Sequence, residues 1–272
     1  MRTDRLWRLF ARASLGALVL LFAVLVLVLV FDPPYFQPGQ IGIDYHFYRG
    51  AASDWLAHGT FYLPHQLAGP YPIRYLHAAD VLYPPVALYL FVPFVLLPAW
   101  TWWAIPMGLT VAALWWLRPA TWTWPVMLVL ALWPWTPGIY LQGNPGMWII
   151  AFEALGLIVA GPAVLVLIKP SLAPFALPGV RRRAWWVALA LFTVACLPFG
   201  TLWLDWWRAA VVNPTNGGLL YSLTSVPSMV LPLVAWLGSS CQRRKARPML
   251  GVSGAGATLW ESLSGRHRSD NS

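Results

Sequence analysis

Residues 13–31 read ASLGALVLLFAVLVLVLVF, a run of 19 apolar or small residues without a charge. At about 1.5 Å of rise per residue, a helix of this length crosses the hydrocarbon core of a bilayer. The run is longer and richer in Leu and Val than a typical cleaved signal sequence, and no small-residue cleavage site follows it. Four arginines precede it: Arg2, Arg5, Arg8 and Arg12. The stretch therefore predicts a retained membrane span that starts in the cytoplasm, where Lys and Arg gather.

The composition of the whole chain also indicates a membrane protein. Of its 272 residues, 59% are hydrophobic and 10% are Asp, Glu, Lys or Arg, whereas a soluble domain carries about 25% charged residues. Such a chain cannot cover a water-facing surface, which excludes a soluble enzyme, a disordered regulator and a small disulfide scaffold. The net charge of +9 is concentrated in short basic clusters beside apolar runs. It therefore indicates membrane topology rather than nucleic-acid binding.

Further apolar segments follow the first. They lie at residues 84–98, 100–117, 122–140, 145–160, 162–178, 185–199 and 219–237. We therefore predict an all-α, polytopic helical bundle of about eight spans in the cell membrane, with both termini in the cytoplasm. The chain then divides into a basic cytoplasmic N-terminus at 1–12, a membrane domain at 13–237, and a Gly/Ser/Arg-rich tail at 238–272 that we expect to be disordered in the cytoplasm.

The longest polar stretch, residues 32–83, is predicted to be an extracytoplasmic loop. Within it, apolar and aromatic residues recur at helical spacing: Tyr45, Tyr48, Ala52, Trp55 and Leu56. This pattern predicts a short amphipathic helix at the outer membrane interface, with Asp44 as its N-cap and Gly59 just after its end. The loop also holds four of the five histidines, but without a compact metal-ligand spacing, so we predict no metal site from them.

Asp44 has two compatible interpretations. It is either an ordinary N-cap, or a general base at an active site on the membrane surface. The helix dipole at an N-terminus favours the carboxylate and weakens it as a base. Burial near the bilayer raises the pKa of the same carboxyl group.

The spacing of the loop residues resembles a known family. Asp44, Tyr48, Ala52, Leu56, Gly59 and Tyr62 are arranged like the first outer loop of the GT-C superfamily of polyprenyl-phosphate-dependent glycosyltransferases, and most like glycosyltransferase family 87, which includes mannosyltransferases. Three later features match in order: Tyr83-Pro84-Pro85, Gly143-Asn144 where the family more often has Gly-Gln, and Lys169-Pro170. The resemblance covers roughly residues 14–200. The chain is shorter than typical members, as a truncated one would be.

The resemblance implies a GT-C-like helical membrane bundle with its active site at the outer face and an acidic residue that acts in catalysis at the position of Asp44. Transfer from a lipid phosphate needs a base for the acceptor hydroxyl and cationic groups for the departing phosphate. We expect Asp44 to be the base. Substrate-binding candidates are Arg49, Arg74, Lys169, Asp54, Asp80 and Asn144. Arg49 and Arg74 can equally be solvated loop arginines. Asp54 and Asp80 can contact the acceptor or support other site residues.

Glu153 and Lys169 are predicted to lie inside the membrane, where ionisable residues are rare and usually functional. Each lies eight residues from Gly161. A hairpin turning at Gly161 would place both about 12 Å from the turn, at equal depth, at 1.5 Å of rise per residue. We therefore expect them to approach each other or share a polar cavity. They form either a structural ion pair, or a site in which Lys169 contacts the donor's phosphate, as its match to the family's Lys-Pro implies.

The leading hypothesis is a membrane hexosyltransferase that moves a hexose, plausibly mannose, from a polyprenyl-phosphate donor to an extracytoplasmic acceptor. Its expected partners are the lipid-linked sugar, a glycolipid or glycan acceptor and membrane lipids, with no nucleic acid. No cofactor is expected beyond the donor substrate, and dependence on a divalent metal is left open. The alternatives are a catalytically inactive or truncated relative that scaffolds envelope assembly, and a transporter with Glu153 and Lys169 on its pathway.

Overall fold

The computed structural model describes residues 2–31, 41–73, 80–217 and 223–246. Within these ranges the chain folds into helices and turns without a β-strand, and Tyr71 and Pro214 form one isolated parallel bridge. The predicted all-α class is confirmed. Arg74 and the tail at 247–272 lie outside the described residues.

The helices include three types of backbone winding. The α-helices are α1 (Arg2–Phe31), α2 (Ile43–His58), α3 (Pro64–Ala68), α4 (Leu88–Phe91), α5 (Pro93–Leu96), α6 (Thr101–Leu117), α7 (Thr123–Ala131), α8 (Trp135–Leu141), α9 (Gly146–Gly156), α10 (Arg183–Cys196), α11 (Leu202–Trp207) and α12 (Val226–Ala246). The 3₁₀ segments are η1 (Pro85–Ala87), η2 (Gly161–Ile168), η3 (Pro170–Gly179) and η4 (Leu197–Phe199). One π-helical segment is η5 (Arg208–Val212).

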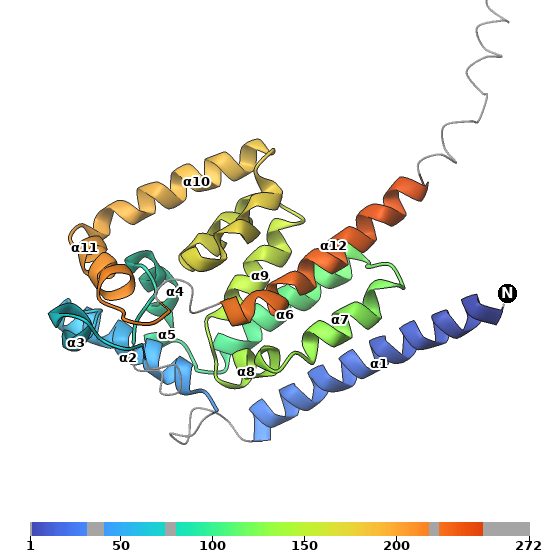
Figure 1. The fold of residues 1–272 in the computed structure, drawn as a ribbon, viewed down its shortest axis with the longest axis horizontal. Helices are drawn as coiled ribbons and strands as arrows, with labels where there is room; N and C mark the ends of the chain where they lie inside the picture. The colour runs from blue at the N-terminus through green and yellow to red at the C-terminus, as the bar shows by residue number, and fades with distance from the viewer. Residues whose placement is uncertain (1, 32–40, 74–79, 218–222, 247–272) are drawn as a thin grey trace, which may run out of the picture.

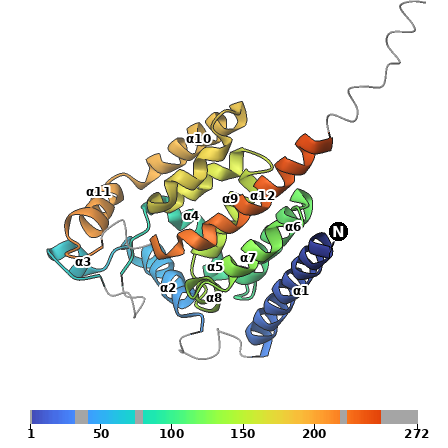
Figure 2. The same ribbon diagram turned by 45° about the vertical axis from the view of Figure 1, so that its right-hand side comes forward.

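The helices are arranged around α6, α9 and α12. Helix α9 packs against α6 and η2, α12 packs against α7 and α9, and α10 covers η2. Helix α1 lies along α7 at one side of the molecule (Figure 1). In both views α3 and α11 lie at one end, whereas the start of α1 and the described end of α12 lie at the other (Figure 2).

Helix α1 confirms that the first apolar run can span a membrane. Residues Arg5–Val30 form a candidate span of 26 residues, and only 6% of its most apolar window is buried. Leu20, for example, is 65% exposed. An apolar helix that buries so little of itself against the protein suits a lipid environment better than water.

The prediction of eight spans is not confirmed. Among the described residues α1 is the one helix that meets the length and hydropathy of a span by itself, and the count rises to four if each of three bent helix pairs is one span. The bends are 120° between Pro85–Leu96 and Thr101–Leu117, 65° between Thr123–Ala131 and Trp135–Leu141, and 98° between Arg183–Phe199 and Leu202–Val212. The apolar runs are therefore helical in pieces.

Proline explains why one further apolar run is not a continuous α-helix. Proline removes a backbone N–H donor and clashes with the preceding turn, which disfavours a continuous α-helix. The predicted span at 162–178 contains Pro170, Pro174 and Pro178, and it forms two 3₁₀ segments that meet at Lys169. Irregular backbone of this kind is tolerated at membrane depth where it is buried in protein or lines a cavity.

The predicted hairpin near Gly161 is present. Helix α9 ends at Gly156, and η2 returns beside it. The two segments touch closely because Gly156 has no side chain: a Cβ there would lie 2.5 Å from the Cβ of Ala163. Lys169 directly follows η2 and therefore lies at the open end of the hairpin, away from the turn.

We predict that Gly156→Ala destabilises the fold by about 1–3 kcal/mol, because the added methyl group overpacks the contact with Ala163. The measurement is the midpoint of thermal unfolding in detergent, followed by tryptophan fluorescence. Gly108→Ala in α6 is the matched control, since a Cβ there meets nothing within 4 Å. Equal midpoints for the two variants would contradict the close packing of α9 on η2.

Candidate functional site

Asp44 lies in the first turn of α2, but it is not the N-cap. The N-cap is Gly42, with φ of 73°, and α2 begins at Ile43, so the predicted N-cap role is wrong. The reason is that another segment caps the helix: the backbone N–H groups of Gly42 and Asp44 donate to the carbonyls of Leu141 and Gln142 at 2.8 and 2.9 Å. The side chain of Asp44 is thereby left for other contacts. Gly59 ends the helix as predicted, with φ of 73°.

Asn144 holds the Asp44 carboxylate. Its Nδ2 donates to Oδ2 of Asp44 at 2.5 Å, across 100 residues of sequence. Its Oδ1 accepts from the backbone N–H of Gly146 at 2.8 Å, at the start of α9. Both ends of the amide are therefore engaged, which fixes its orientation. An amide that donates to a carboxylate oxygen stabilises the ionised form of the acid.

The turn that carries Asn144 is fixed by its own contacts. Gly143 has φ of 68°, a conformation that favours glycine, and its carbonyl accepts from the indole N–H of Trp102 at 2.8 Å. A Cβ on Gly143 would lie 2.7 Å from the ring of Trp103 and 2.9 Å from Cβ of Tyr45. The α2 helix and the turn therefore approach so closely that only glycine fits between them.

Lys169 is the third member of the cluster. Only 3% of it is exposed, and its Nζ lies 5.7 Å from the centre of the Tyr83 ring, within the range of a cation–π contact. The backbone at Lys169 is where η2 ends and η3 begins. Its charge acts on the Asp44 carboxylate. The structure thus places Lys169 within electrostatic range of the hydrogen-bonded pair of Asp44 and Asn144, so three residues that the sequence singled out separately lie near one another.

Two opposing influences set the pKa of Asp44. Burial raises the pKa of this carboxyl group, whereas the hydrogen bond from Asn144 and the positive charge of Lys169 lower it. Burial is the larger influence, so the net direction is upward. A carboxylate with a raised pKa is a stronger base than an exposed aspartate, which suits general-base catalysis.

We define the Asp44 site as Asp44, Asn144, Lys169 and Tyr83. Further aromatic residues pack against its Tyr83 ring. Tyr48, one turn after Asp44, packs edge-on against Tyr83 with ring centroids 5.2 Å apart. The hydroxyl of Tyr62 donates to the carbonyl of Tyr83 at 2.9 Å. Two further loop residues that carried the family resemblance, Tyr48 and Tyr62, therefore contact Tyr83.

Other predicted site residues lie elsewhere. The guanidinium of Arg49 donates to the carbonyls of Phe94 and Val95 at 3.3 and 3.2 Å, at the end of α5, and its predicted substrate role stays a prediction. Asp54 is exposed on α2. Arg74 is outside the described residues, so its predicted role stays a prediction.

Asp80 pairs with a histidine that the sequence analysis did not connect to it. Its Oδ1 lies 2.7 Å from Nε2 of His65, and the Asp80 side chain is 2% exposed, whereas that of His65 is 50% exposed. The two residues are 15 positions apart in the chain. No local sequence pattern predicts such a pair.

The predicted approach of Glu153 to Lys169 is wrong. Glu153 is 1% exposed, and neither carboxylate oxygen has a hydrogen-bond partner among the described residues. The hairpin forms, but η2 is a 3₁₀ segment, which rises faster and winds more tightly than an α-helix. Equal residue counts on the two arms therefore do not give equal depth or a shared face, and Lys169 faces Tyr83 and Asp44 instead.

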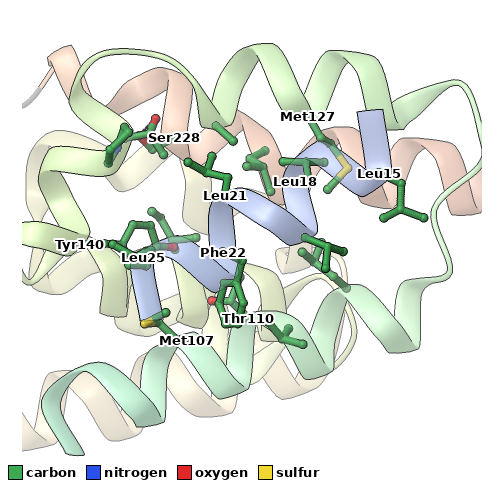
Figure 3. A pocket seen from close by; sticks show the side chains of 18 of the residues that line it. Leu15, Leu18, Leu21, Phe22, Leu25, Met107, Thr110, Met127, Tyr140 and Ser228 are labelled. Carbon is green, nitrogen blue, oxygen red and sulfur yellow. Dashed lines mark hydrogen bonds between the residues drawn. The ribbon is translucent and has the colours of Figure 1, made fainter. Parts of the chain in front are cut away.

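A large apolar cavity adjoins the Asp44 site. It has a volume of 980 Å³ and lies between α1, α6, α7 and α8, with Leu18, Phe22 and Met107 among its walls (Figure 3). Its polar lining includes Thr136 and Ser228, whose hydroxyls bond to each other at 2.8 Å. Helix α8 connects cavity and site, because Tyr140 and Leu141 line the cavity while the carbonyl of Leu141 caps α2.

No group of three or more His, Cys, Asp or Glu side chains that could hold a metal ion exists in the described part of the chain. The Asp44 site itself has one carboxylate and one amide beside an ammonium group.

Comparison with known proteins gives no match: no protein-family model, curated protein or solved structure is detectably similar to this chain.

We predict that Gly143→Ala destabilises the protein by about 2–4 kcal/mol, because alanine is strained at positive φ and its methyl group overlaps Trp103 and Tyr45. Gly50→Ala in α2 is the control: a Cβ there meets nothing within 4 Å, and alanine favours the helix. The measurement is again the thermal unfolding midpoint. The close junction between α2 and the 143–144 turn would be contradicted by a Gly143→Ala midpoint at or above that of the unaltered protein.

Proposed function

We propose that this chain is a membrane hexosyltransferase of the GT-C type, similar to glycosyltransferase family 87, which transfers a hexose from a polyprenyl-phosphate donor to an extracytoplasmic acceptor. One observation carries the proposal: the half-buried Asn144 bonds the buried Asp44 carboxylate from a distant segment, and the buried Lys169 of a third segment lies within electrostatic range of that carboxylate. Such a transfer requires a base for the acceptor hydroxyl and a cationic group for the departing phosphate, which Asp44 and Lys169 would supply.

The proposed step assigns a role to each group. Asp44 takes the proton of the acceptor hydroxyl as its oxygen attacks the anomeric carbon of the donor sugar. The bond from that carbon to the phosphate oxygen breaks, and the polyprenyl phosphate leaves with the electron pair. Lys169 stabilises the negative charge on the departing phosphate, and Asn144 keeps the Asp44 carboxylate in place.

The apolar cavity supports a lipid-linked donor. Ligand sites of roughly 300–1,000 Å³ are typical for small molecules, and the wall of this one is almost entirely apolar, with α1 as one side. A hydrocarbon chain lying there would place its phosphate end near α8, whose last residues border the Asp44 site. The arrangement suits a substrate with one long apolar part and one charged head.

The fold also fits the proposed topology. The start of α1 and the described end of α12 lie at one end of the molecule, and α3 and α11 at the other (Figures 1 and 2). With α1 entering the membrane from the cytoplasm, α2 and α3 follow its extracytoplasmic end. This is the side on which the proposed acceptor is found.

The direct test is Asp44→Asn, assayed for transfer from radiolabelled polyprenyl-phosphate hexoses in membranes. Loss of the base predicts a fall in turnover of about a hundredfold or more, since general-base catalysis contributes about that much. Asn preserves the shape of Asp and still accepts the hydrogen bond from Asn144, so the fold is expected to remain intact.

Asp205→Asn in α11 is the matched control for loss of one acid, and we expect it to keep full turnover. Thermal unfolding of both variants separates catalysis from folding. Unchanged transfer by Asp44→Asn would overturn the assignment of the base, and absence of transfer by the unaltered protein from every lipid-linked hexose supplied would overturn the proposed function.

The pH dependence of transfer gives a second test. Transfer requires ionised Asp44, so the rate falls as pH drops through the raised pKa of this group. Asn144 and Lys169 both lower that pKa, so Asn144→Ala and Lys169→Met each raise it further. Both variants should therefore move the acidic limb of the rate profile to higher pH. Lys169→Met should also raise KM for the donor.

The measurement is the transfer rate across the acidic range at saturating donor. If the acidic limb stays in place for Asn144→Ala, Asp44 is not the titrating group. If Lys169→Met leaves both the limb and the donor KM unchanged, Lys169 has no role in donor binding.

A further inference from the structure

A second polar cluster lies away from the Asp44 site, at the end of the molecule formed by α3 and η5. Its centre is the pair of His65, at the second position of α3, and Asp80. Nε2 of His65 lies 2.7 Å from the Asp80 carboxylate. The carboxylate is buried and the imidazole is half-exposed. The ring of His65 is therefore held in place by Asp80 and still accessible from solvent.

The surrounding frame is rigid. Gln66, beside His65, is fully buried, and its amide donates to the carbonyl of Val81 at 3.1 Å and accepts from the N–H of Val81 at 3.2 Å. The same amide donates to the hydroxyl of Tyr71 at 3.0 Å, which in turn donates to the carbonyl of Ala209 at 2.5 Å. These bonds tie α3 to the segment after Asp80 and to η5. A frame of this kind holds both members of the pair in one geometry.

The pair leaves one ring nitrogen available. With Nε2 engaged by Asp80, Nδ1 of His65 has no partner among the described residues, and the ring meets Tyr71 edge-on at 5.4 Å between centroids. A carboxylate that accepts the Nε2 proton selects the tautomer in which Nδ1 carries a lone pair. Such a nitrogen accepts a hydrogen bond from a hydroxyl group.

Asp80 is linked to the Asp44 site through a short stretch of chain that ends at Tyr83. Asp80 and Tyr83 are three residues apart, so their Cα atoms lie within roughly 11 Å. Tyr83 is the ring over which Lys169 lies. A ligand that reaches from His65 toward Tyr83 would therefore extend from the exposed edge to the buried cluster.

We propose that His65, held by Asp80, is a binding residue for the acceptor, and that its Nδ1 accepts a hydrogen bond from a hydroxyl of an acceptor glycan. The inference rests on the proposed hexosyl transfer for the identity of the ligand. Asp80 acts through His65 as a positioning residue, in place of the direct acceptor contact considered from the sequence.

The first measurement does not need enzyme activity. Histidine labelled with ¹⁵N in the full-length protein, in lipid nanodiscs at mildly alkaline pH, reports the tautomer of each ring, and His65→Gln identifies the signal of His65. We expect Nε2 to be protonated and Nδ1 bare. Addition of methyl mannoside, as a soluble glycan probe, should shift the Nδ1 signal.

The second measurement is the kinetics of His65→Gln. Glutamine retains an amide N–H for Asp80, but it has no acceptor atom at the position that Nδ1 occupies in histidine. Loss of one hydrogen bond should raise KM for the acceptor about tenfold and leave KM for the donor unchanged. Exposed His58, at the end of α2, gives the matched control His58→Gln, which should leave both values unchanged.

The outcomes separate the two proposals. A ring of His65 that is protonated at both nitrogens, or an Nδ1 signal that the glycan does not move, overturns the acceptor site and leaves the pair a structural contact. An equal rise of both KM values overturns it as well. If the unaltered protein transfers no hexose, the proposed function fails, and the nitrogen signals with and without methyl mannoside still decide whether His65 binds a glycan.

Discussion

The hydrogen bond between Asn144 and Asp44 is the contact on which the arrangement of the site depends. A buried carboxylate is costly unless it is hydrogen-bonded or paired, and Asp44 has an amide donor and a nearby ammonium group. To supply both, α2 must lie against the turn before α9, and the junction of η2 and η3 must reach the same place. One charged group thus constrains three segments that are far apart in the chain.

Glycine makes this approach sterically possible. Gly143 and Gly156 both lie where a Cβ would collide with a neighbouring segment. The first allows α2 to meet the 143–144 turn, and the second allows η2 to lie against α9, which brings Lys169 toward Asp44. The indole of Trp102 then closes the turn from the other side through the carbonyl of Gly143. The positions of the polar side chains in this site therefore depend on the close approach of backbone segments at these two glycines.

Sequence reasoning located much of the candidate site but little of its geometry. Of the singled-out residues, Asn144 bonds Asp44 and Lys169 lies within electrostatic range of it, and Gly59 ends α2 as predicted. The N-cap of α2, the contacts of Arg49 and the pairing of Glu153 with Lys169 depend on which distant segment supplies a partner. The carbonyl of Leu141 helps to cap α2, and two carbonyls at the end of α5 accept from Arg49. The 3₁₀ winding of η2 turns Lys169 away from Glu153. None of these features has a local signal.

The sequence by itself determined that the chain is apolar, all-α and headed by a helix able to cross a bilayer, because composition and an uninterrupted apolar run decide these properties locally. The bending of later apolar runs, the cavity beside α8 and the pairing of His65 with Asp80 were decided by the tertiary structure. The physical reason is that a bend direction, a cavity and a contact between distant residues are relations between segments, which the hydropathy of the sequence does not specify.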